Sequence, residues 1–479
     1  MELNESLVKS VVEQVLARLG NNGSGAPVAG SSFRGRFGIF TDANEAVAAA
    51  REAQDQLSRR TLADRRRIVD HIRRIARDQA VELGTMEMEE TKIGRLDHKI
   101  EKLITLANLA PGVEMLHTEA FSGDYGLTVV EHAPFGVICA ITPITHSLPT
   151  ISCNAINMIS AGNAVVCNPH PGGKRIAAEG VRRYNEAIFR DVGIDNLICV
   201  ITEPTLKTAD ILFKHPHVNL ICVTGGAAVA KAAMSQGKRA VVGGPGNPPV
   251  VVDETADLDR AARSIIAGCA YDNNLLCIAE KEVFAVDSIF DKLMDAMDRA
   301  GAVRLNAREM DAFTKAAISS AGEGASKHDV PTKALIGRDA PVLARAIGKN
   351  IDPKTEVIFG ETDASNPLVS VEQMMPALPF VRCRNVDEAI ELARVNEHGF
   401  RHTSIIHSNN VDNMTKMGKA LDTTLFVKNG PCTAGLGIGG EGYYTLSVAG
   451  PTGEGVTNTL TFTRERRCTM TDKLRILGR

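Results

Sequence analysis

The feature that most constrains the fold of this chain is a regular alternation of short apolar segments and longer amphipathic segments between residues 136 and 236. The apolar segments predict strands and the amphipathic segments predict helices. The expected strands are 136–142, 164–167, 197–201 and 219–223, and the expected helices are 151–160, 175–192, 207–214 and 227–236. Strands and helices that alternate at this spacing form a parallel, doubly wound sheet, which binds nucleotides at the carboxyl ends of its strands. We therefore predict an α/β fold with a nucleotide site.

A second α/β unit is expected after a segment at 243–249 that is rich in glycine and proline. Such a composition is typical of a boundary between domains. Residues 256–426 then alternate again between apolar and amphipathic segments. Ahead of the first unit, residues 41–116 are predicted to be helical and residues 127–132 to form a strand. A chain of 479 residues has room for two or three such domains.

The composition argues against several classes of protein. The formal net charge is 54 minus 57, or -3, with both signs interspersed, which argues against binding to nucleic acid or to a membrane surface. No apolar run approaches the roughly 18 to 20 residues that span a bilayer. The ten cysteines are scattered, without a CxxC pair or a Cys/His cluster at zinc-site spacing. This pattern predicts reduced thiols in a cytosolic protein and no metal site.

One cysteine, Cys277, lies in a polar loop at 271–281. An expected helix that begins near Leu258 precedes this loop, and an expected strand at 281–286 follows it. A thiol on a loop is within reach of a substrate, whereas Cys269 on the apolar stripe of the helix is interpreted as a core residue. Because any single cysteine is most simply a small buried hydrophobe, the loop alone assigns no role to Cys277.

The first residues of the chain form a separate pattern. Residues 1–19 predict an amphipathic helix, and residues 20–36 have the composition of a flexible linker. The polarity of the helix and its acidic residues argue against a signal or transit peptide. Two interpretations remain: a docking tag on a tether, or a terminal helix that packs on its own body or on a second subunit.

A glycine turn follows the last expected strand of the first unit. Residues 224–226 read Thr-Gly-Gly and precede an expected helix, where backbone N–H groups and the helix dipole can bind a phosphate. The turn does not match GxGxxG, so a purely structural tight turn explains it equally well.

The order of several motifs resembles the aldehyde dehydrogenase superfamily and, within it, the CoA-acylating aldehyde dehydrogenases of bacterial microcompartments. The resemblance runs from about Phe37 to Cys468. Its most specific motifs are Ser160-Ala161-Gly162-Asn163, Asn168-Pro169-His170-Pro171, Thr224-Gly225-Gly226, Gly246-Asn247-Pro248-Pro249 with the segment 250–258, the segment 274–281, Phe426-Val427-Lys428-Asn429-Gly430-Pro431 and Gly439-Gly440-Glu441-Gly442. Several independent matches in the right order are far more specific than any one of them.

This resemblance implies an aldehyde dehydrogenase-like α/β fold in several parts. The expected parts are a Rossmann-type nucleotide-binding domain at 37–116 and 135–243, a second α/β catalytic domain at 244–436, and an oligomerisation hairpin with a C-terminal strand at 117–134 and 451–467. The strand 127–132 and the segment 456–463 correspond to the pairing elements, so a homodimer or homotetramer is implied. Residues 1–19 resemble an encapsulation peptide, which favours the docking tag.

The resemblance also implies that Cys277 is the catalytic nucleophile, which forms a thiohemiacetal with an aldehyde and then holds a thioester. The oxyanion would be stabilised by the backbone N–H of Cys277 and by a side chain that follows the strand 136–142. This chain departs from the family there, because hydrolytic relatives carry an asparagine at the position of Thr145. The side-chain donor therefore stays open between Thr145 and His146.

A second departure concerns the fate of the thioester. Hydrolytic relatives place a general-base glutamate where this chain has Val242. Because valine cannot accept a proton from water, the resemblance implies that the acyl group is transferred to the thiol of CoA instead.

The resemblance implies NAD and coenzyme A as cofactors that use one crevice in turn. The implied cofactor-binding residues are Pro143, Asn168, Pro169, His170, Gly225, Gly226 and Glu372. Asn168 replaces the lysine that hydrolytic relatives direct at the adenosine ribose. Glu372 aligns with the carboxylate that holds the nicotinamide ribose; the alternative is a surface glutamate in a loop.

The expected function is NAD-dependent, reversible oxidation of propionaldehyde or acetaldehyde with CoA to acyl-CoA. The alternatives are a hydrolytic aldehyde dehydrogenase that yields the free acid and an inactive scaffold of a microcompartment. The expected location is the cytoplasm, inside a bacterial microcompartment, with shell proteins bound through residues 1–19.

Overall fold

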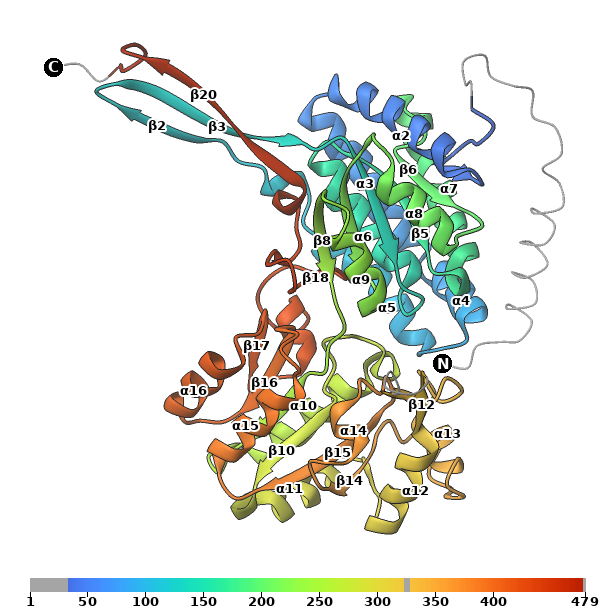
Figure 1. The fold of residues 1–479 in the computed structure, drawn as a ribbon, viewed down its shortest axis with the longest axis vertical. Coiled ribbons are helices and arrows are strands. Elements are labelled where there is room, and N and C mark those ends of the chain that lie inside the picture. The colour runs from blue at the N-terminus through green and yellow to red at the C-terminus, as the bar shows by residue number, and fades with distance from the viewer. Residues whose placement is uncertain (1–32, 323–327, 477–479) are drawn as a thin grey trace. The chain divides into compact units, whose positions relative to one another are not determined.

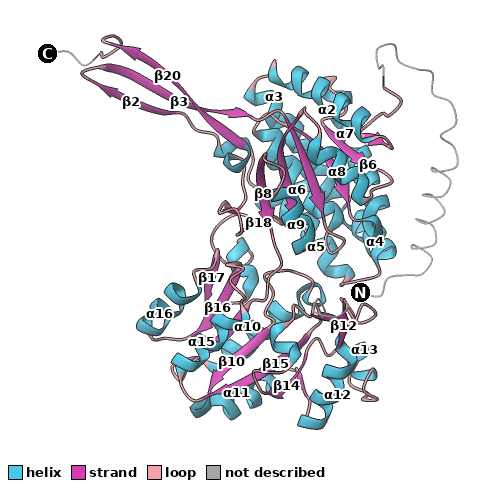
Figure 2. Cartoon of the chain, in the orientation of Figure 1, coloured by secondary structure: helices cyan, strands magenta, loops and turns pink. Residues whose placement is uncertain are grey.

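The computed structural model describes residues 33–322 and 328–476, and from Gly35 onward they belong to one compact unit. The predicted helix 1–19 and the predicted linker up to residue 32 lie outside the described residues. Figure 2 shows strands flanked by helices through most of this unit. The α/β fold class predicted from the sequence is confirmed.

The first sheet has six parallel strands in the order β1-β6-β5-β4-β7-β8. These strands are β1 (Ile39–Phe40), β4 (Val137–Thr142), β5 (Ala164–Pro169), β6 (Ile198–Ile201), β7 (Val218–Thr224) and β8 (Arg239–Gly243). The connecting helices are α6 (Ser147–Ser160), α7 (Lys174–Val192), α8 (Leu206–Lys214) and α9 (Ala227–Met234). The predicted alternation is therefore confirmed, and Figure 1 shows these elements together.

Two helix boundaries differ from the prediction by more than one residue. Helix α6 begins at Ser147 and not at residue 151, because Pro149 lies in the first turn, where its missing N–H costs nothing. Helix α9 ends at Met234 and not at residue 236, since the chain turns at Gly237, whose φ is +69°. Every residue of α6 is buried, so this helix lies in the interior of the unit.

The predicted helical stretch 41–116 contains four helices. They are α2 (Ala43–Ser58), α3 (Leu62–Asp78), α4 (Ala80–Thr91) and α5 (Leu96–Leu109). Helix α3 begins with a capping box in which the side chains of Thr61 and Asp64 accept from each other's backbone N–H. Helix α5 packs on α4 and α3, with its buried face toward them.

The second sheet has seven parallel strands in the order β11-β14-β15-β10-β9-β16-β17. The strands are β9 (Pro249–Val252), β10 (Glu282–Val286), β11 (Val303–Arg304), β14 (Ile358–Thr362), β15 (Ala377–Cys383), β16 (Thr403–His407) and β17 (Leu425–Lys428). Its helices are α10 (Leu258–Ala270), α11 (Asp287–Arg299), α12 (Ala307–Ala317), α13 (Ala340–Arg345), α14 (Pro367–Ser370), α15 (Val386–Asn396) and α16 (Val411–Leu421). The second α/β unit and the helix-to-strand position of Cys277 are confirmed, and Cys269 is a buried core residue of α10.

A third, antiparallel sheet joins two strands from the first half of the chain to one strand near the end of the described residues. Its order is β2-β3-β20, with β2 (Glu119–Gly123), β3 (Gly126–Pro134) and β20 (Thr463–Thr471). Figure 1 shows these three strands as one long ribbon. Strand β3 contains the predicted strand 127–132.

The C-terminal pairing strand was predicted at 456–463, and this position is wrong. Residues 458–462 turn instead, because the side chain of Asn458 accepts from the backbone N–H of Leu460 at 2.9 Å and leads into the short 3-10 helix Leu460–Phe462. The extended strand starts only at Thr463 and runs to Thr471. The predicted limit of the pairing element at residue 467 therefore lies inside strand β20.

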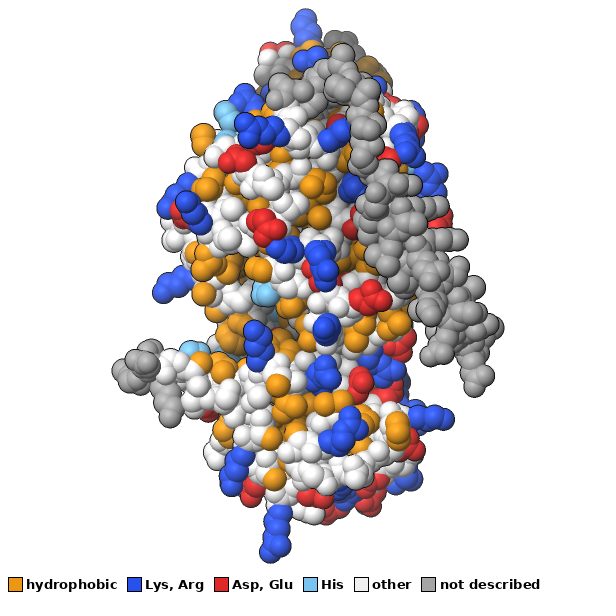
Figure 3. Space-filling view, turned by 90° about the vertical axis from the view of Figure 1, so that its right-hand side faces the viewer, with side chains coloured by type: hydrophobic (Ala, Val, Ile, Leu, Met, Phe, Trp, Pro, Cys, Tyr) orange, Lys and Arg blue, Asp and Glu red, His pale blue; other side chains and the backbone are white. Residues whose placement is uncertain are grey.

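The surface carries charges of both signs. On the face in Figure 3, Lys and Arg side chains alternate with Asp, Glu and apolar side chains, in keeping with the net charge of -3. Among the described residues, no helix is long and apolar enough to cross a membrane.

Candidate active site

The loop that carries Cys277 has an unusual backbone. Asp272, Asn273 and Asn274 have φ angles of 49°, 54° and 66°, in the left-handed region. Residues other than glycine seldom adopt these angles, although Asp and Asn adopt them more readily than most. Three consecutive residues of this kind persist only where the surrounding structure holds them in place.

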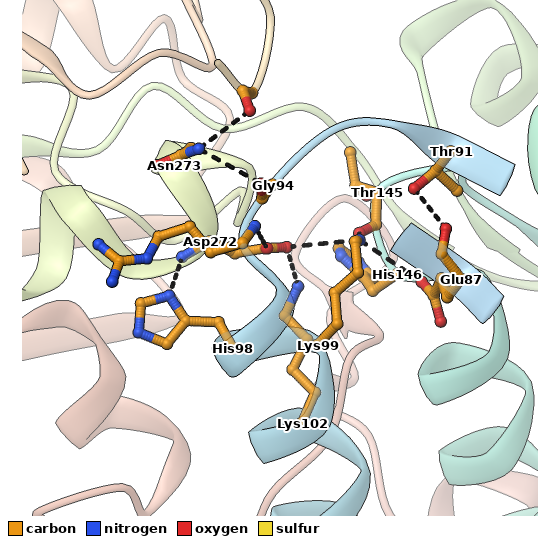
Figure 4. Close-up of polar contacts among 12 residues, drawn as sticks. Glu87, Thr91, Gly94, His98, Lys99, Lys102, Thr145, His146, Asp272 and Asn273 are labelled. Atoms are coloured by element: carbon orange, nitrogen blue, oxygen red, sulfur yellow. Dashed lines mark hydrogen bonds and ion pairs between the residues drawn. The ribbon is translucent and has the colours of Figure 1, made fainter. Parts of the chain in front are cut away.

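Side chains from distant segments hold the first two of these residues. The Asp272 carboxylate accepts a hydrogen bond from the backbone N–H of Arg95 at 2.8 Å and pairs with the Lys102 ammonium. The Asn273 amide donates to the Gly337 carbonyl at 3.0 Å and to the Asp339 carboxylate at 2.8 Å. Figure 4 shows these contacts converging on the loop. The loop therefore has one conformation that several parts of the chain determine.

The Cys277 thiol at the end of this segment is partly accessible. Its side chain is half-buried, whereas Cys468 is exposed and all other cysteines are buried. Burial raises the pKa of the Cys277 thiol to about 12, the neighbouring Glu372 carboxylate raises it further, and the Lys281 and Lys102 ammonium groups act in the opposite direction. The thiol is therefore protonated in the free protein at neutral pH, and its ionisation depends on the charges around it.

Gly246 and His402 lie beside Cys277. A Cβ atom on Gly246 would lie 2.3 Å from the Cys277 carbonyl oxygen and 3.2 Å from His402 Cγ, so only glycine permits this close approach. His402 is buried, and its Nε2 has no hydrogen-bond partner within the described part of the chain. Burial lowers the pKa of His402 to about 4, aided by Lys281, so the imidazole is neutral. A lone histidine before a strand gave no signal in the sequence, and His402 was not predicted.

The two candidates for the oxyanion donor lie in the turn between β4 and α6. Thr145 is half-buried, and its carbonyl accepts a hydrogen bond from the Lys99 ammonium at 3.3 Å. His146 is buried, and its Nδ1 has no partner among the residues that the structure describes. Burial, with Lys102 and Lys99 nearby, lowers the pKa of His146 well below its usual value, so this imidazole is also neutral. A neutral imidazole and a hydroxyl can each donate one hydrogen bond, so the choice between them remains open.

Behind this turn lies a buried network of charges that the sequence did not predict. Lys99 Nζ lies 3.8 Å from Glu87 Oε1 and 4.0 Å from Asp272 Oδ2, and the Lys102 ammonium contacts the same Asp272 oxygen. All four side chains are buried. Figure 4 places this network between α5 and the Cys277 loop. The available signal was that both lysines share the buried face of α5 with the core leucines, where an unpaired lysine is rare.

The predicted cofactor-binding residues, apart from Glu372, lie at one edge of the first sheet. β4, β5 and β7 are neighbours, and their carboxyl ends lead into Pro143, into Asn168-Pro169-His170 and into Gly225-Gly226. Parallel sheets bind nucleotides at this edge. The structure therefore brings these six residues together in the expected place.

The individual side chains at this edge differ in their contacts. Asn168 is buried, and its Oδ1 accepts a hydrogen bond from the Thr208 hydroxyl at 2.6 Å. His170 is exposed, and its Nδ1 accepts from the Gly172 backbone N–H at 3.0 Å. Apart from each glycine's own chain neighbours, no atom of the residues that the structure describes lies within 4 Å of a Cβ built on Gly225 or Gly226, and none of their side chains caps helix α9. The open glycine turn at the start of α9 fits a phosphate group.

Glu372 lies apart from that edge, in the loop between α14 and β15. It is half-buried, and burial raises the pKa of its carboxyl group. Lys281 lowers this pKa, and the backbone N–H of Gly246, the same glycine that approaches the Cys277 carbonyl, helps to lower it. Glu372 is thus a partly exposed loop residue near Cys277, and its role in binding the nicotinamide ribose stays a prediction.

Val242 lies on β8 and is fully buried. Its backbone N–H donates a hydrogen bond to the Thr452 hydroxyl at 2.9 Å. An apolar side chain therefore occupies the position at which hydrolytic aldehyde dehydrogenases have a general-base glutamate. Among the described residues, no cluster of three or more His, Cys, Asp or Glu side chains could hold a metal ion.

Comparison with known proteins agrees with this geometry. The model of the aldehyde dehydrogenase family matches residues 40–462. The acetaldehyde dehydrogenase (acetylating) EutE of Salmonella typhimurium is 43% identical over 479 residues, which cover 99% of this chain and 100% of the relative.

Two solved structures have similar folds. A propionaldehyde dehydrogenase of Rhodopseudomonas palustris with bound CoA and an acylated cysteine is 42% identical, with a TM-score of 0.89 and coverage of 92% of this chain and 100% of that one. A propionaldehyde dehydrogenase from the fucose utilisation microcompartment of Clostridium phytofermentans is 43% identical, with the same TM-score and coverage. The resemblance inferred from the motifs is confirmed, and the chain belongs to the aldehyde dehydrogenase family, among its CoA-acylating members.

Proposed function

We propose that this protein catalyses the reaction aldehyde + NAD⁺ + CoA-SH → acyl-CoA + NADH + H⁺, with acetaldehyde or propionaldehyde as substrate. The observation that carries this proposal is the half-buried thiol of Cys277 on a rigid loop, in a chain 43% identical to an acetylating acetaldehyde dehydrogenase. The reaction is reversible, because a thioester and an aldehyde are both accessible from the same enzyme-bound species.

In this mechanism the Cys277 thiol first releases its proton, which is the H⁺ of the overall reaction. The thiolate sulfur then adds to the aldehyde carbon, and the carbonyl oxygen becomes an oxyanion. The Cys277 backbone N–H and one side chain, from Thr145 or His146, donate hydrogen bonds to this oxygen. Loss of hydride from the same carbon restores the carbonyl group and leaves a thioester on Cys277. The thiol of CoA then attacks the thioester, forms acyl-CoA and releases the Cys277 thiol.

NAD, when bound, supplies the acceptor for the hydride. The residues that would hold it are the open turn Gly225-Gly226 for its phosphates, Glu372 for the ribose of the nicotinamide, and the segments at Pro143 and 168–170 along the same sheet edge. Coenzyme A would use the same crevice in turn.

One feature supports transfer to CoA and not to water. The buried Val242 offers no proton acceptor for an attacking water. For the transfer to CoA itself, the neutral imidazole of His402 beside Gly246 is a candidate acceptor for the proton of the CoA thiol: its Nδ1 contacts the Thr403 hydroxyl at 2.8 Å, and its Nε2 has no hydrogen-bond partner within the described residues.

The test is an NADH assay with acetaldehyde, propionaldehyde and butyraldehyde, each with and without CoA. We expect sustained turnover only with CoA, and no turnover in Cys277→Ala. Sustained formation of free acid without CoA would favour a hydrolytic enzyme. An inactive scaffold would give no NADH with any of these aldehydes.

The parts of the chain have separate proposed roles. Residues 37–116 and 135–243 bind the nucleotide, 244–436 carry the nucleophile, and the pairing element 117–134 with 451–467, corrected to include the whole of β20, joins subunits into a homodimer or homotetramer. Residues 1–19 dock the enzyme to shell proteins of a microcompartment in the cytoplasm, a location supported by the Clostridium relative. Deleting 1–19 should leave turnover unchanged and abolish co-purification with shells.

A further inference from the structure

Lys281 is a fully buried lysine four residues after the candidate nucleophile. Its ammonium donates three hydrogen bonds, and all three acceptors belong to the loop that leads to Cys277. They are the Asn274 carbonyl at 2.8 Å, the Asn274 side-chain oxygen at 2.6 Å and the Leu276 carbonyl at 3.4 Å. A buried ammonium with its three protons satisfied in this way is fixed in position.

The left-handed backbone of Asn274, with φ of 66°, allows both of its oxygens to contact one ammonium. The Asn274 amide nitrogen in turn donates to the Glu280 carbonyl at 2.8 Å, so the segment from Asn274 to Lys281 closes on itself. The backbone of Lys281 is tied as well, because its N–H donates to Pro248 and its carbonyl accepts from Gln373. The segment that carries Cys277 is thus closed around one lysine.

No carboxylate in the described part of the chain contacts the Lys281 ammonium directly. Burial lowers the pKa of Lys281, and Glu372 is the carboxylate that acts on it most strongly and raises this pKa. The hydrogen-bond acceptors of Lys281 are neutral amide oxygens, and within the described residues it forms no ion pair, whereas Lys102 pairs directly with Asp272. A buried charge without a paired counterion acts strongly on its neighbours, because little water screens it.

We propose that Lys281 is a positioning residue that fixes the Cys277 loop and stabilises the thiolate form of Cys277. This role rests on the proposed function, in which Cys277 is the nucleophile. The hydrogen bonds of the closed segment hold the ammonium in place, and its positive charge is what acts on the thiolate.

The charges around Cys277 are consistent with this role of Lys281. Burial and Glu372 raise the pKa of the Cys277 thiol, whereas Lys281 and then Lys102 lower it. Glu372 also interacts with Lys281 and is half-buried. The other titratable groups that interact with Lys281 are Cys269, Cys432, Glu280, Glu282 and His402, and all five are buried.

The test measures the rate at which iodoacetamide alkylates Cys277 between pH 7 and 9, followed by mass spectrometry of the peptide that contains it. The exposed Cys468 serves as an internal reference in each sample. Lys281→Gln and Lys281→Met remove the charge, Lys281→Arg keeps it, and Asn274→Gly loosens the closed segment while it keeps both the charge and the left-handed angle. Two neutral variants are included in case the methionine variant does not fold.

We expect both neutral variants to lower the alkylation rate of Cys277 about tenfold at every pH, for a pKa rise of about one unit. The alkylation rate of Cys277 should stay within about threefold of the parent in Lys281→Arg and Asn274→Gly, because these changes leave the charge near Cys277 in place. The alkylation rate of the exposed Cys468 should stay within about threefold of the parent in every variant. Unchanged alkylation in the neutral variants would overturn the proposal, as would an equally large loss in Asn274→Gly, which would trace the effect to geometry alone.

The same samples separate this inference from the proposed function. If alkylation of Cys277 abolishes aldehyde oxidation but the neutral variants react at the parental rate, only the role of Lys281 is refuted. If the alkylated protein still oxidises aldehydes, Cys277 is not the nucleophile, and both proposals are refuted.

Discussion

The buried pair Lys102–Asp272 permits a quantitative prediction. Both side chains are fully buried, and Lys102→Met would leave the Asp272 carboxylate without its closest cation. Removing one partner of a buried ion pair typically costs about 3 to 5 kcal/mol. Here the backbone N–H of Arg95 at 2.8 Å and Lys99 at 4.0 Å still support the carboxylate. We therefore expect a loss of about 3 kcal/mol, at the lower end of that range.

The double variant Lys102→Met/Asp272→Asn removes both charges together. An asparagine tolerates the φ of 49° at this position and can still accept the hydrogen bond from Arg95. We expect each single variant to lose about 3 kcal/mol and the double variant only about 1 to 2 kcal/mol. The surface pair Lys214–Asp210 provides a matched control, because Lys214→Met should cost less than about 0.5 kcal/mol.

The assay is urea unfolding followed by far-ultraviolet circular dichroism, since the chain has no tryptophan. Midpoints at one protein concentration, converted with a shared m-value, give the differences in unfolding free energy. If the loss in the double variant equals the sum of the two single losses within about 0.5 kcal/mol, the two charges do not stabilise each other and the reasoning is refuted.

Three further predictions concern the candidate site. Val242→Glu should raise the ratio of free acid to acyl-CoA, measured by chromatography of the products; a folded variant with an unchanged ratio would contradict the missing-base argument. Gly246→Ala should lower kcat about 100-fold, because its Cβ would lie 2.3 Å from the Cys277 carbonyl, and steady-state kinetics beside a melting curve would show whether the loss is local. His402 and His407 have pKa values lowered by burial to about 4. In the unfolded chain these two histidines bind protons at a higher pH than in the folded protein, so the free energy of unfolding should fall as the pH falls from about 6.5 to 4. Urea midpoints across that range should show a less steep fall in His407→Gln.

The sequence predicted both parallel sheets because the periods of strands and helices are local properties of the chain. It misplaced the C-terminal pairing strand because most residues of β20 are exposed, so no apolar alternation marks it. Its register with β3 is set by backbone pairing and by two side-chain contacts, Thr128 with Thr469 at 3.0 Å and His132 with Thr463 at 3.2 Å.

The same distinction applies to the candidate site. The position of Cys277 between a helix and a strand followed from local patterns. The contacts that hold its loop did not, since Lys102 and Asp272 are 170 residues apart in the chain. The candidate roles of His402 and Lys281 depend on their neighbours in the folded protein, so they could not be predicted from the sequence.

The left-handed segment before Cys277 has a consequence for how the enzyme fails. Asp272 is held by α5, Asn273 by the segment around Gly337, and Asn274 by the beginning of β10. No one of these segments produces the loop conformation by itself. The position of the Cys277 side chain therefore depends on the packing of helix α5 against the second sheet and its loops. Mild heating or low denaturant should abolish activity before secondary structure is lost, so that activity is the most sensitive gauge of native assembly in this protein.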